Sequence, residues 1–206
     1  MSFDDFTYFF SPLYRLKELF RQGWIGKVPS SEIESVADHS FAVTFLCLLL
    51  LPIENELREK SNVNLKILNK LEILEKSIVH DLPESQFLDL DKTINGIISK
   101  DEFDDFKMKL DLNAEKKIRE VFELFLKNRF SLENLPMLPD MNSKRNEEDE
   151  FIKLIDTIEL YFQTTTYLKK EFISEENAKI FLDSAKNKVL SFSNKFLFVS
   201  YLFNEN

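Results

Sequence analysis

Glycine is scarce in this chain: only three glycines occur among 206 residues. Glycine-rich phosphate loops and dinucleotide-binding turns need several glycines, because their backbone must approach the ligand closely. This scarcity excludes both a P-loop and a Rossmann fold. The length predicts a single domain over residues 1–206, and the 44% hydrophobic content is sufficient for a sizeable core.

The charge of the chain restricts its partners. With 27 basic and 36 acidic residues, the formal net charge is −9. A chain of this sign repels phosphate backbones, so we expect no long nucleic acid as partner. The single cysteine, Cys47, cannot form an intrachain disulfide. It lies in an apolar run, which predicts a buried, inert thiol and a reducing compartment.

The longest apolar run extends from Phe41 to Ile53 and covers 13 residues. A membrane-spanning helix needs roughly 20 residues, so we interpret this run as a core helix. The start of the chain carries Asp4 and Asp5, whereas a secretory signal begins with basic residues. We therefore expect a cytoplasmic protein without a membrane partner.

Apolar residues recur at helical spacing in the first half of the chain. Ser11-Pro12 has the residue types that begin a helix, and Gly23 is expected to end it. Residues 35–38 contain the serine and acidic residue of a capping box, directly before the apolar run. A third helix is predicted over residues 65–79, and Pro83 should end or bend it.

The second half has the same character. Helical spacing predicts helices over residues 94–110, 114–128 and 151–162, and a last helix from Ser174 to Phe192. Prolines and a charge run predict an exposed loop over residues 135–150. No alternating strand pattern competes, so the predicted fold class is all-α, a single-domain helical bundle.

The chain has two histidines, and each stands beside an aspartate at one end of an apolar helix. These pairs are Asp38-His39 and His80-Asp81. A lone histidine near a core is usually a hydrogen-bonded structural residue, but two such pairs favour a metal site. Imidazole with carboxylate suits zinc, cobalt or manganese, because neutral nitrogen binds the ion and carboxylate balances its charge.

Two segments around these histidines resemble a known family. Residues 34–40 read Glu-Ser-Val-Ala-Asp-His-Ser, and residues 79–84 read Val-His-Asp-Leu-Pro-Glu. They resemble the HD-domain metal-dependent phosphohydrolases, and most closely the small 5′-deoxynucleotidase branch. Residues 16–17 and 21–24 are also similar to that branch. The resemblance implies an HD-domain core over about residues 16–160, with C-terminal helices in residues 174–203 that pack on it or form an interface.

The resemblance implies one divalent metal ion, of which cobalt, manganese and zinc are candidates. Its predicted ligands are His39, His80, Asp81 and an aspartate on a later apolar helix. Asp156 is our choice for the last ligand, because isoleucines flank it on a predicted helix. Asp140 is the alternative, although it lies in a predicted loop.

The resemblance also implies two catalytic carboxylates, Glu84 and Asp89. Glu84 would handle protons, and Asp89 would contact nucleotide or water. A carboxylate beside the attacking water can take its proton. The alternative for both is a solvated loop after a helix. Leu88 stands where the family commonly has glycine, which leaves the substrate preference open.

Phosphate binding needs cationic or backbone donors. Arg21, Lys27 and Lys92 are the candidate cations near the motifs. The resemblance favours Arg21 as the group that orients phosphate and Trp24 as a neighbouring substrate contact, with Lys92 as a further contact. Trp24 could equally cover the core.

The resemblance implies a phosphomonoesterase that hydrolyses (deoxy)nucleoside 5′-monophosphates to nucleoside and phosphate. One alternative is a hydrolase of another small phosphorylated metabolite or signalling nucleotide. Another is a non-catalytic helical binding protein with a vestigial metal site, against which Glu84 argues, because a structural site needs no proton acceptor. The apolar segment 196–203 could form a homodimer interface or pack into the core.

Overall fold

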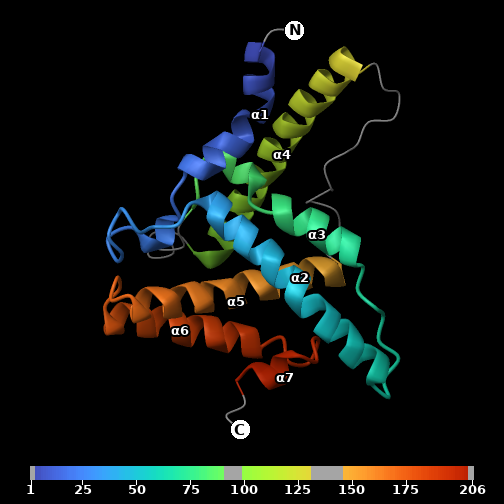
Figure 1. Ribbon diagram of the computed structural model, residues 1–206, viewed down its shortest axis with the longest axis vertical. Helices are drawn as coiled ribbons and strands as arrows, with labels where there is room; N and C mark the ends of the chain where they lie inside the picture. Colours follow the sequence, from blue (N-terminus) through green and yellow to red (C-terminus); the bar gives the residue numbers. More distant parts are fainter. Residues whose placement is uncertain (1–2, 91–98, 131–145, 204–206) are drawn as a thin grey trace. The chain divides into compact units, whose positions relative to one another are not determined.

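The computed structural model describes residues 3–90, 99–130 and 146–203 (Figure 1). Within these ranges the chain forms helices and no strand, apart from an isolated backbone bridge between Phe20 and Ser35. The predicted all-α class is confirmed. The elements, in chain order, are α1 (Phe3–Glu18), the 3-10 helix η1 (Gln22–Trp24), α2 (Val36–Lys60), α3 (Lys70–Val79), the 3-10 helix η2 (Leu82–Gln86), α4 (Lys100–Phe130), α5 (Glu147–Lys169), α6 (Glu175–Leu190) and α7 (Val199–Leu202).

The chain divides into two compact units. Unit 1 contains residues 1–25, 33–38 and 79–143, and unit 2 contains residues 26–32, 39–78 and 144–206. The chain passes from one unit to the other directly before His39 and directly after Ile78. The two motif histidines therefore stand beside points where the chain changes unit. A single domain over residues 1–206 stays a prediction.

Unit 2 contains a hydrophobic core built from α2, α3, α5, α6 and the C-terminal segment. On α2, Val43, Cys47 and Leu51 follow one another at four-residue spacing and are at most 1% exposed. α5 and α6 lie side by side (Figure 1). Burial raises the pKa of the Cys47 thiol to about 12, which confirms the prediction of a buried, inert cysteine.

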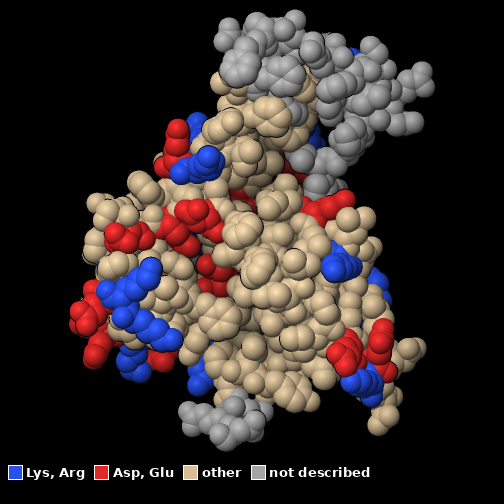
Figure 2. Space-filling model, viewed as in Figure 1, with Lys and Arg blue, Asp and Glu red and all other residues tan. Residues whose placement is uncertain are grey.

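The opposite side of α2 is apolar and exposed. Phe41, Phe45, Leu49 and Ile53 are between 48% and 66% exposed, and Figure 2 shows an area without charged side chains over this helix. By length and composition α2 could cross a membrane. An apolar stretch of 18 residues within it has a mean hydropathy of 1.9, and 33% of that stretch is buried. A core helix of a soluble protein passes the same test, and the inner face of α2 does line the core as predicted.

A buried ion network connects α2 to the start of α5 within unit 2. The Arg58 guanidinium donates to Glu54 Oε1 at 2.7 Å, to Glu147 Oε1 at 2.8 Å and to the carbonyl oxygen of Lys66 at 2.7 Å. The second oxygen of Glu54 accepts from the backbone N–H of Phe198 at 3.0 Å. Because the side chains of Arg58 and Glu54 are both 0% exposed, each depends on the other for its charge balance.

Unit 1 is formed by α1, η2 and α4, which contact one another. Leu16 of α1, Pro83 and Ser85 of η2, and Ile118 of α4 are buried. This packing fixes the short segment that follows His80 and Asp81. Packing against α1 and α4 thus holds η2 in place.

Both predicted limits of α1 are wrong. α1 begins at Phe3 and continues through Pro12, which is buried, although a proline inside a helix removes one hydrogen bond and its ring crowds the preceding turn. α1 also ends at Glu18, before Gly23. The next backbone groups are used elsewhere: the carbonyl of Leu19 accepts from Val36 N, and Arg21 N donates to the carbonyl of Glu34.

α3 begins at Lys70 and not at residue 65. The side-chain oxygen of Asn69 accepts from the backbone N–H groups of Leu71 and Glu72 and so starts the helix there. The capping box predicted at Ser35 is confirmed, because Asp38 N donates to Ser35 Oγ and Ser35 N donates to Asp38 Oδ2.

The second half contains further corrections. One helix, α4, replaces the two predicted over 94–110 and 114–128, because no glycine or proline interrupts residues 100–130; residues 94–98 lie outside the described residues. α5 begins inside the predicted loop, where Asn146 and Asp149 form a capping box. The Ser174 cap is confirmed, but α6 ends at Leu190, before Phe192.

The C-terminal segment packs into the core of unit 2. Phe196, Phe198 and Val199 are at most 3% exposed and belong to the same cluster as the core residues of α2 and α5. Phe151 of α5 contacts Phe196 edge-on, with ring centres 5.5 Å apart. This supports the core-packing interpretation of residues 196–203, whereas the homodimer stays a prediction.

We predict that Arg58→Ala lowers the free energy of unfolding by about 3 to 5 kcal/mol, because it leaves Glu54 as a buried charge without its ion partner. The measurement is urea unfolding followed by circular dichroism. Lys60→Ala is the control on the same helix, since its pair with Glu56 is 71% and 64% exposed, and an exposed ion pair contributes little to stability. Equal effects of the two substitutions would contradict the prediction.

Candidate metal centre

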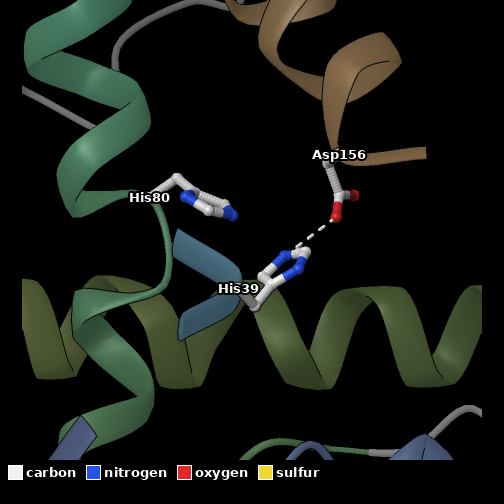
Figure 3. A group of neighbouring side chains, drawn as sticks. All are labelled: His39, His80 and Asp156. Atoms are coloured by element: carbon white, nitrogen blue, oxygen red, sulfur yellow. Dashed lines mark ion pairs between the residues drawn. The ribbon is translucent and has the colours of Figure 1, made fainter. Parts of the chain in front are cut away.

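His39 and two carboxylates of α5 form a cluster inside unit 2. His39 Nε2 lies 3.2 Å from Asp156 Oδ1, and His39 Nδ1 lies 2.8 Å from Glu159 Oε2. Figure 3 shows the His39–Asp156 pair. The imidazole is 1% exposed, Glu159 is 5% exposed and Asp156 is 34% exposed. The ring is therefore held between a buried carboxylate and one that solvent reaches.

Local sequence explains why these side chains meet. Asp156 and Glu159 are three residues apart, so they lie on neighbouring positions of one helix face. The adjacent Ile155 and Ile158 are buried in the core of unit 2 and fix the rotation of α5 about its axis. His39 lies in the first turn of α2, just after the Ser35 capping box.

His39 Nε2 and Asp156 Oδ1, on one side of the ring, fit a divalent cation. They offer an imidazole nitrogen and a carboxylate oxygen, which is the combination that zinc, cobalt and manganese accept, whereas Glu159 contacts the opposite nitrogen. Three acidic or imidazole side chains so close together also favour a positive charge among them. The structure thus contains a His/Asp/Glu cluster that could hold a metal ion.

His80 and Asp81 belong to unit 1 and follow directly on α3. His80 Nε2 lies 3.3 Å from Asp81 Oδ2, and both side chains are about 15% exposed. Figure 3 labels His80 at the end of its helix. The same Asp81 oxygen lies 3.4 Å from Arg21 Nη1, so this carboxylate faces both an imidazole and a guanidinium.

Asp89 anchors the backbone of η1. Its Oδ2 accepts from the backbone N–H of Gln22 at 2.8 Å, and its Oδ1 lies 3.5 Å from Arg21 Nη1. This places Asp89 beside the predicted phosphate-orienting arginine. The preceding Leu88 has a φ of 158°, at a position where the family that the sequence resembles commonly has glycine.

Glu84 is a buried carboxyl on η2. Its side chain is 4% exposed, and Lys107 Nζ of α4 lies 3.2 Å from its Oε1. Its other oxygen has no hydrogen-bond partner among the described residues. Burial, followed by the charges of Asp81 and Asp89, raises the pKa of Glu84 to about 9, against the opposing effect of Lys107 and Arg21.

Four other candidates differ in what the structure says of them. Trp24 is 2% exposed and its indole N–H donates to Glu34 Oε1 at 2.8 Å, which agrees with the interpretation that it covers the core. The ammonium group of Lys27 lies 5.5 Å from the centre of the Phe181 ring. Lys92 and Asp140 lie outside the described residues.

Sequence reasoning gave no role to Glu159 or Lys107, which the structure places beside His39 and Glu84. Glu159 could have been found, because it stands three residues after Asp156 on an apolar helix. Lys107 carried no such signal, since it lies among many charged residues of α4. Burial lowers the pKa of Lys107, but the charges of Glu84, Asp111 and Asp81 have a larger combined effect, so the pKa is raised.

Comparison with known proteins assigns the chain to a family. The model of the HD domain matches residues 13–195, so the chain belongs to the HD domain family. No curated protein matches the chain. Similar solved structures include a conserved hypothetical protein from Pyrococcus furiosus, with 25% identity, coverage of 94% of this chain and 93% of that chain, and a TM-score of 0.62.

Two further structures share the fold. A protein from Pyrococcus horikoshii OT3 is 25% identical and has a TM-score of 0.59, and the match covers 88% of this chain and 87% of that chain. An HD-domain phosphohydrolase from Listeria innocua is 16% identical and has a TM-score of 0.62, and the match covers 97% of this chain and 86% of that chain. The all-α fold is thus that of the HD domain family.

We predict that Glu84→Gln stabilises the metal-free protein increasingly as the pH rises. Wild-type Glu84 stays protonated when folded but ionises at a pKa near 4.5 when unfolded, so its contribution is fully present below pH 4.5 and is lost up to pH 9. The advantage of glutamine should therefore grow by up to about 1.4 kcal/mol per pH unit in this window.

Thermal unfolding of both proteins in chelator at pH 5.5, 7 and 8.5 measures this difference. The control is Glu56→Gln, whose carboxylate is 64% exposed and should give a difference that does not grow with pH. A constant difference for Glu84→Gln across the three pH values would show that Glu84 ionises normally in the folded protein.

Proposed function

We propose that this protein is a metal-dependent phosphohydrolase that hydrolyses (deoxy)nucleoside 5′-monophosphates to nucleoside and phosphate. The observation that carries the proposal is the buried imidazole of His39 between two carboxylates of α5, in a chain of the HD domain family. The Listeria innocua protein described as an HD-domain phosphohydrolase supports the reaction class. The resemblance to the 5′-deoxynucleotidase branch supports the substrate.

The predicted ligands of one divalent ion are His39, His80, Asp81 and Asp156. His39 and Asp156 come from unit 2, and His80 and Asp81 from unit 1. A bound divalent ion would supply Lewis acidity for phosphate oxygen and acidity for water at neutral pH. The remaining chemistry falls to the side chains of this chain.

Glu84 is the proposed proton-handling group. Its carboxyl is buried, and among the described residues Lys107 pairs with one of its oxygens, so its pKa depends strongly on nearby charge. Added positive charge would lower that pKa towards neutrality, where a carboxyl exchanges protons with water and leaving group most effectively. A purely structural metal site needs no nearby proton acceptor, so Glu84 argues against the binding-protein alternative.

Arg21 is the proposed phosphate-orienting group, and Asp89 supports it. Asp89 fixes the backbone next to Arg21, and both Asp81 and Asp89 lie within 3.5 Å of one guanidinium nitrogen. These carboxylates limit the positions that the guanidinium can take. A planar, oriented guanidinium can then bind phosphate through a pair of parallel donors.

A phosphate-release screen tests the reaction, substrate and metal together. The purified protein is incubated with cobalt, manganese or zinc and with nucleoside 5′-monophosphates, 3′-monophosphates, diphosphates and sugar phosphates. We expect release from 5′-monophosphates above all. Preferential release from another phosphorylated compound would contradict the substrate, and no release from metal-loaded protein would favour the binding-protein alternative.

We predict that wild-type protein binds about one divalent ion per chain and that His39→Ala and His80→Ala each lose most of it, because each removes a neutral nitrogen donor. Elemental analysis after dialysis measures the content. Asp156→Asn should also lose metal, whereas Asp183→Asn, an exposed carboxylate on α6, should keep it. Unchanged content in His80→Ala would contradict the predicted ligand set.

Arg21 provides a separate prediction. If its guanidinium binds phosphate through two donors, Arg21→Lys should lower kcat/KM almost as much as Arg21→Ala, by roughly 10- to 100-fold, the range of about 1.5 to 3 kcal/mol for a charged hydrogen bond. Arg119→Lys is the control, because Arg119 has nearly the same exposure, 19% against 20%, and pairs with a carboxylate on α4. Near-wild-type activity of Arg21→Lys, with metal content equal in all variants, would refute this role.

A further inference from the structure

Glu159 holds one side of the His39 ring, and no motif called attention to it. Its Oε2 lies 2.8 Å from His39 Nδ1, and both side chains are at most 5% exposed. On the other side of the same ring, Nε2 lies 3.2 Å from Asp156 Oδ1. Two carboxylates of one helix thus approach the two different nitrogens of one imidazole.

We propose that Glu159 is a positioning residue that keeps the proton of neutral His39 on Nδ1, so that Nε2 offers its lone pair beside Asp156 to a divalent cation. This inference rests on the proposed metal site. It concerns which atom of His39 binds the ion and what fixes that choice. Glu159 itself is assigned no contact with the ion.

The hydrogen-bond chemistry of the ring supports the assignment. A neutral imidazole has one N–H donor and one lone pair, and an ionised carboxylate only accepts. The short contact of Nδ1 with Glu159 therefore requires the proton on Nδ1. Nε2 then directs a lone pair towards an oxygen of Asp156, an approach that is repulsive unless positive charge lies between the two atoms.

Burial separates the roles of the two carboxylates. Glu159 is 5% exposed and Asp156 is 34% exposed. An ion arriving from solvent can reach Asp156 more easily, whereas Glu159 is enclosed with His39 as its partner. A carboxylate on the far nitrogen of a ligating histidine fixes the ring orientation and makes the near nitrogen a better donor.

The experiment measures the affinity for Co²⁺ of metal-free protein by titration with a competing chelator, in wild type, Glu159→Gln and Glu159→Leu. We expect Glu159→Leu to bind Co²⁺ up to 100-fold more weakly and Glu159→Gln about 10-fold more weakly, because glutamine still accepts from Nδ1 but carries no charge. The visible absorption of bound Co²⁺ should also change in Glu159→Leu, since the ring would no longer be held.

Glu148→Gln is the matched control. Glu148 is also a buried carboxylate of α5, but it pairs with Lys66, at 2.8 Å, and not with a histidine. Its replacement should alter the free energy of unfolding and leave the Co²⁺ affinity and spectrum unchanged. A merely structural Glu159 would behave in the same way as Glu148.

The outcomes separate this inference from the proposed function. Equal Co²⁺ affinity in wild type and in either Glu159 variant would overturn the positioning role, even if the enzyme hydrolyses nucleotides. Should Glu159→Leu fail to fold, Glu159→Gln alone decides, because glutamine preserves size and hydrogen bonding. Graded loss of affinity in a protein that hydrolyses no phosphate ester would support the positioning role and refute the phosphohydrolase. Absence of Co²⁺ binding by wild type would overturn both.

Discussion

The packing of α5 against α2 inside unit 2 is the interaction on which the candidate site depends. Phe151, Leu154, Ile155 and Ile158 form the buried stripe of α5. This stripe fixes the rotation of the helix, and the positions beside it, at residues 156 and 159, are therefore presented to His39. The ion network of Arg58 holds the start of the same helix, so a structural interaction several turns away determines the placement of polar groups at the site.

Unit 1 contributes a polar cluster in which carboxylates are more numerous than cations. Asp81, Asp89 and Glu84 lie near Arg21 and Lys107, and the two aspartates add to the effect of burial in raising the pKa of Glu84. A buried carboxyl that remains protonated relieves the excess negative charge. A divalent cation nearby would relieve the same excess of negative charge. Glu84 would then release its proton more readily.

The sequence predicted the fold class and the caps at Ser35 and Ser174, because these follow from local rules, whereas the helix start predicted at Ser11 is wrong. Ser35 and Ser174 begin helices where side-chain chemistry requires it. The C-terminal end of α1 could not be predicted, because it depends on backbone pairing between residues 19–21 and 34–36, which are distant in sequence. Motif residues that meet through long-range packing, such as His39 and Asp156, were found through family resemblance, whereas Lys107 had neither a motif nor a local signal.

His39 lies in the first turn of α2, where Ser35 and Asp38 satisfy part of the helix start. Glu159 is buried on α5 and contacts the His39 ring at 2.8 Å. Because Glu159 acts on Nδ1, it can orient the ring and strengthen the donor at Nε2 without occupying the atom that a cation needs, whereas a carboxylate on Nε2 alone would compete for that atom.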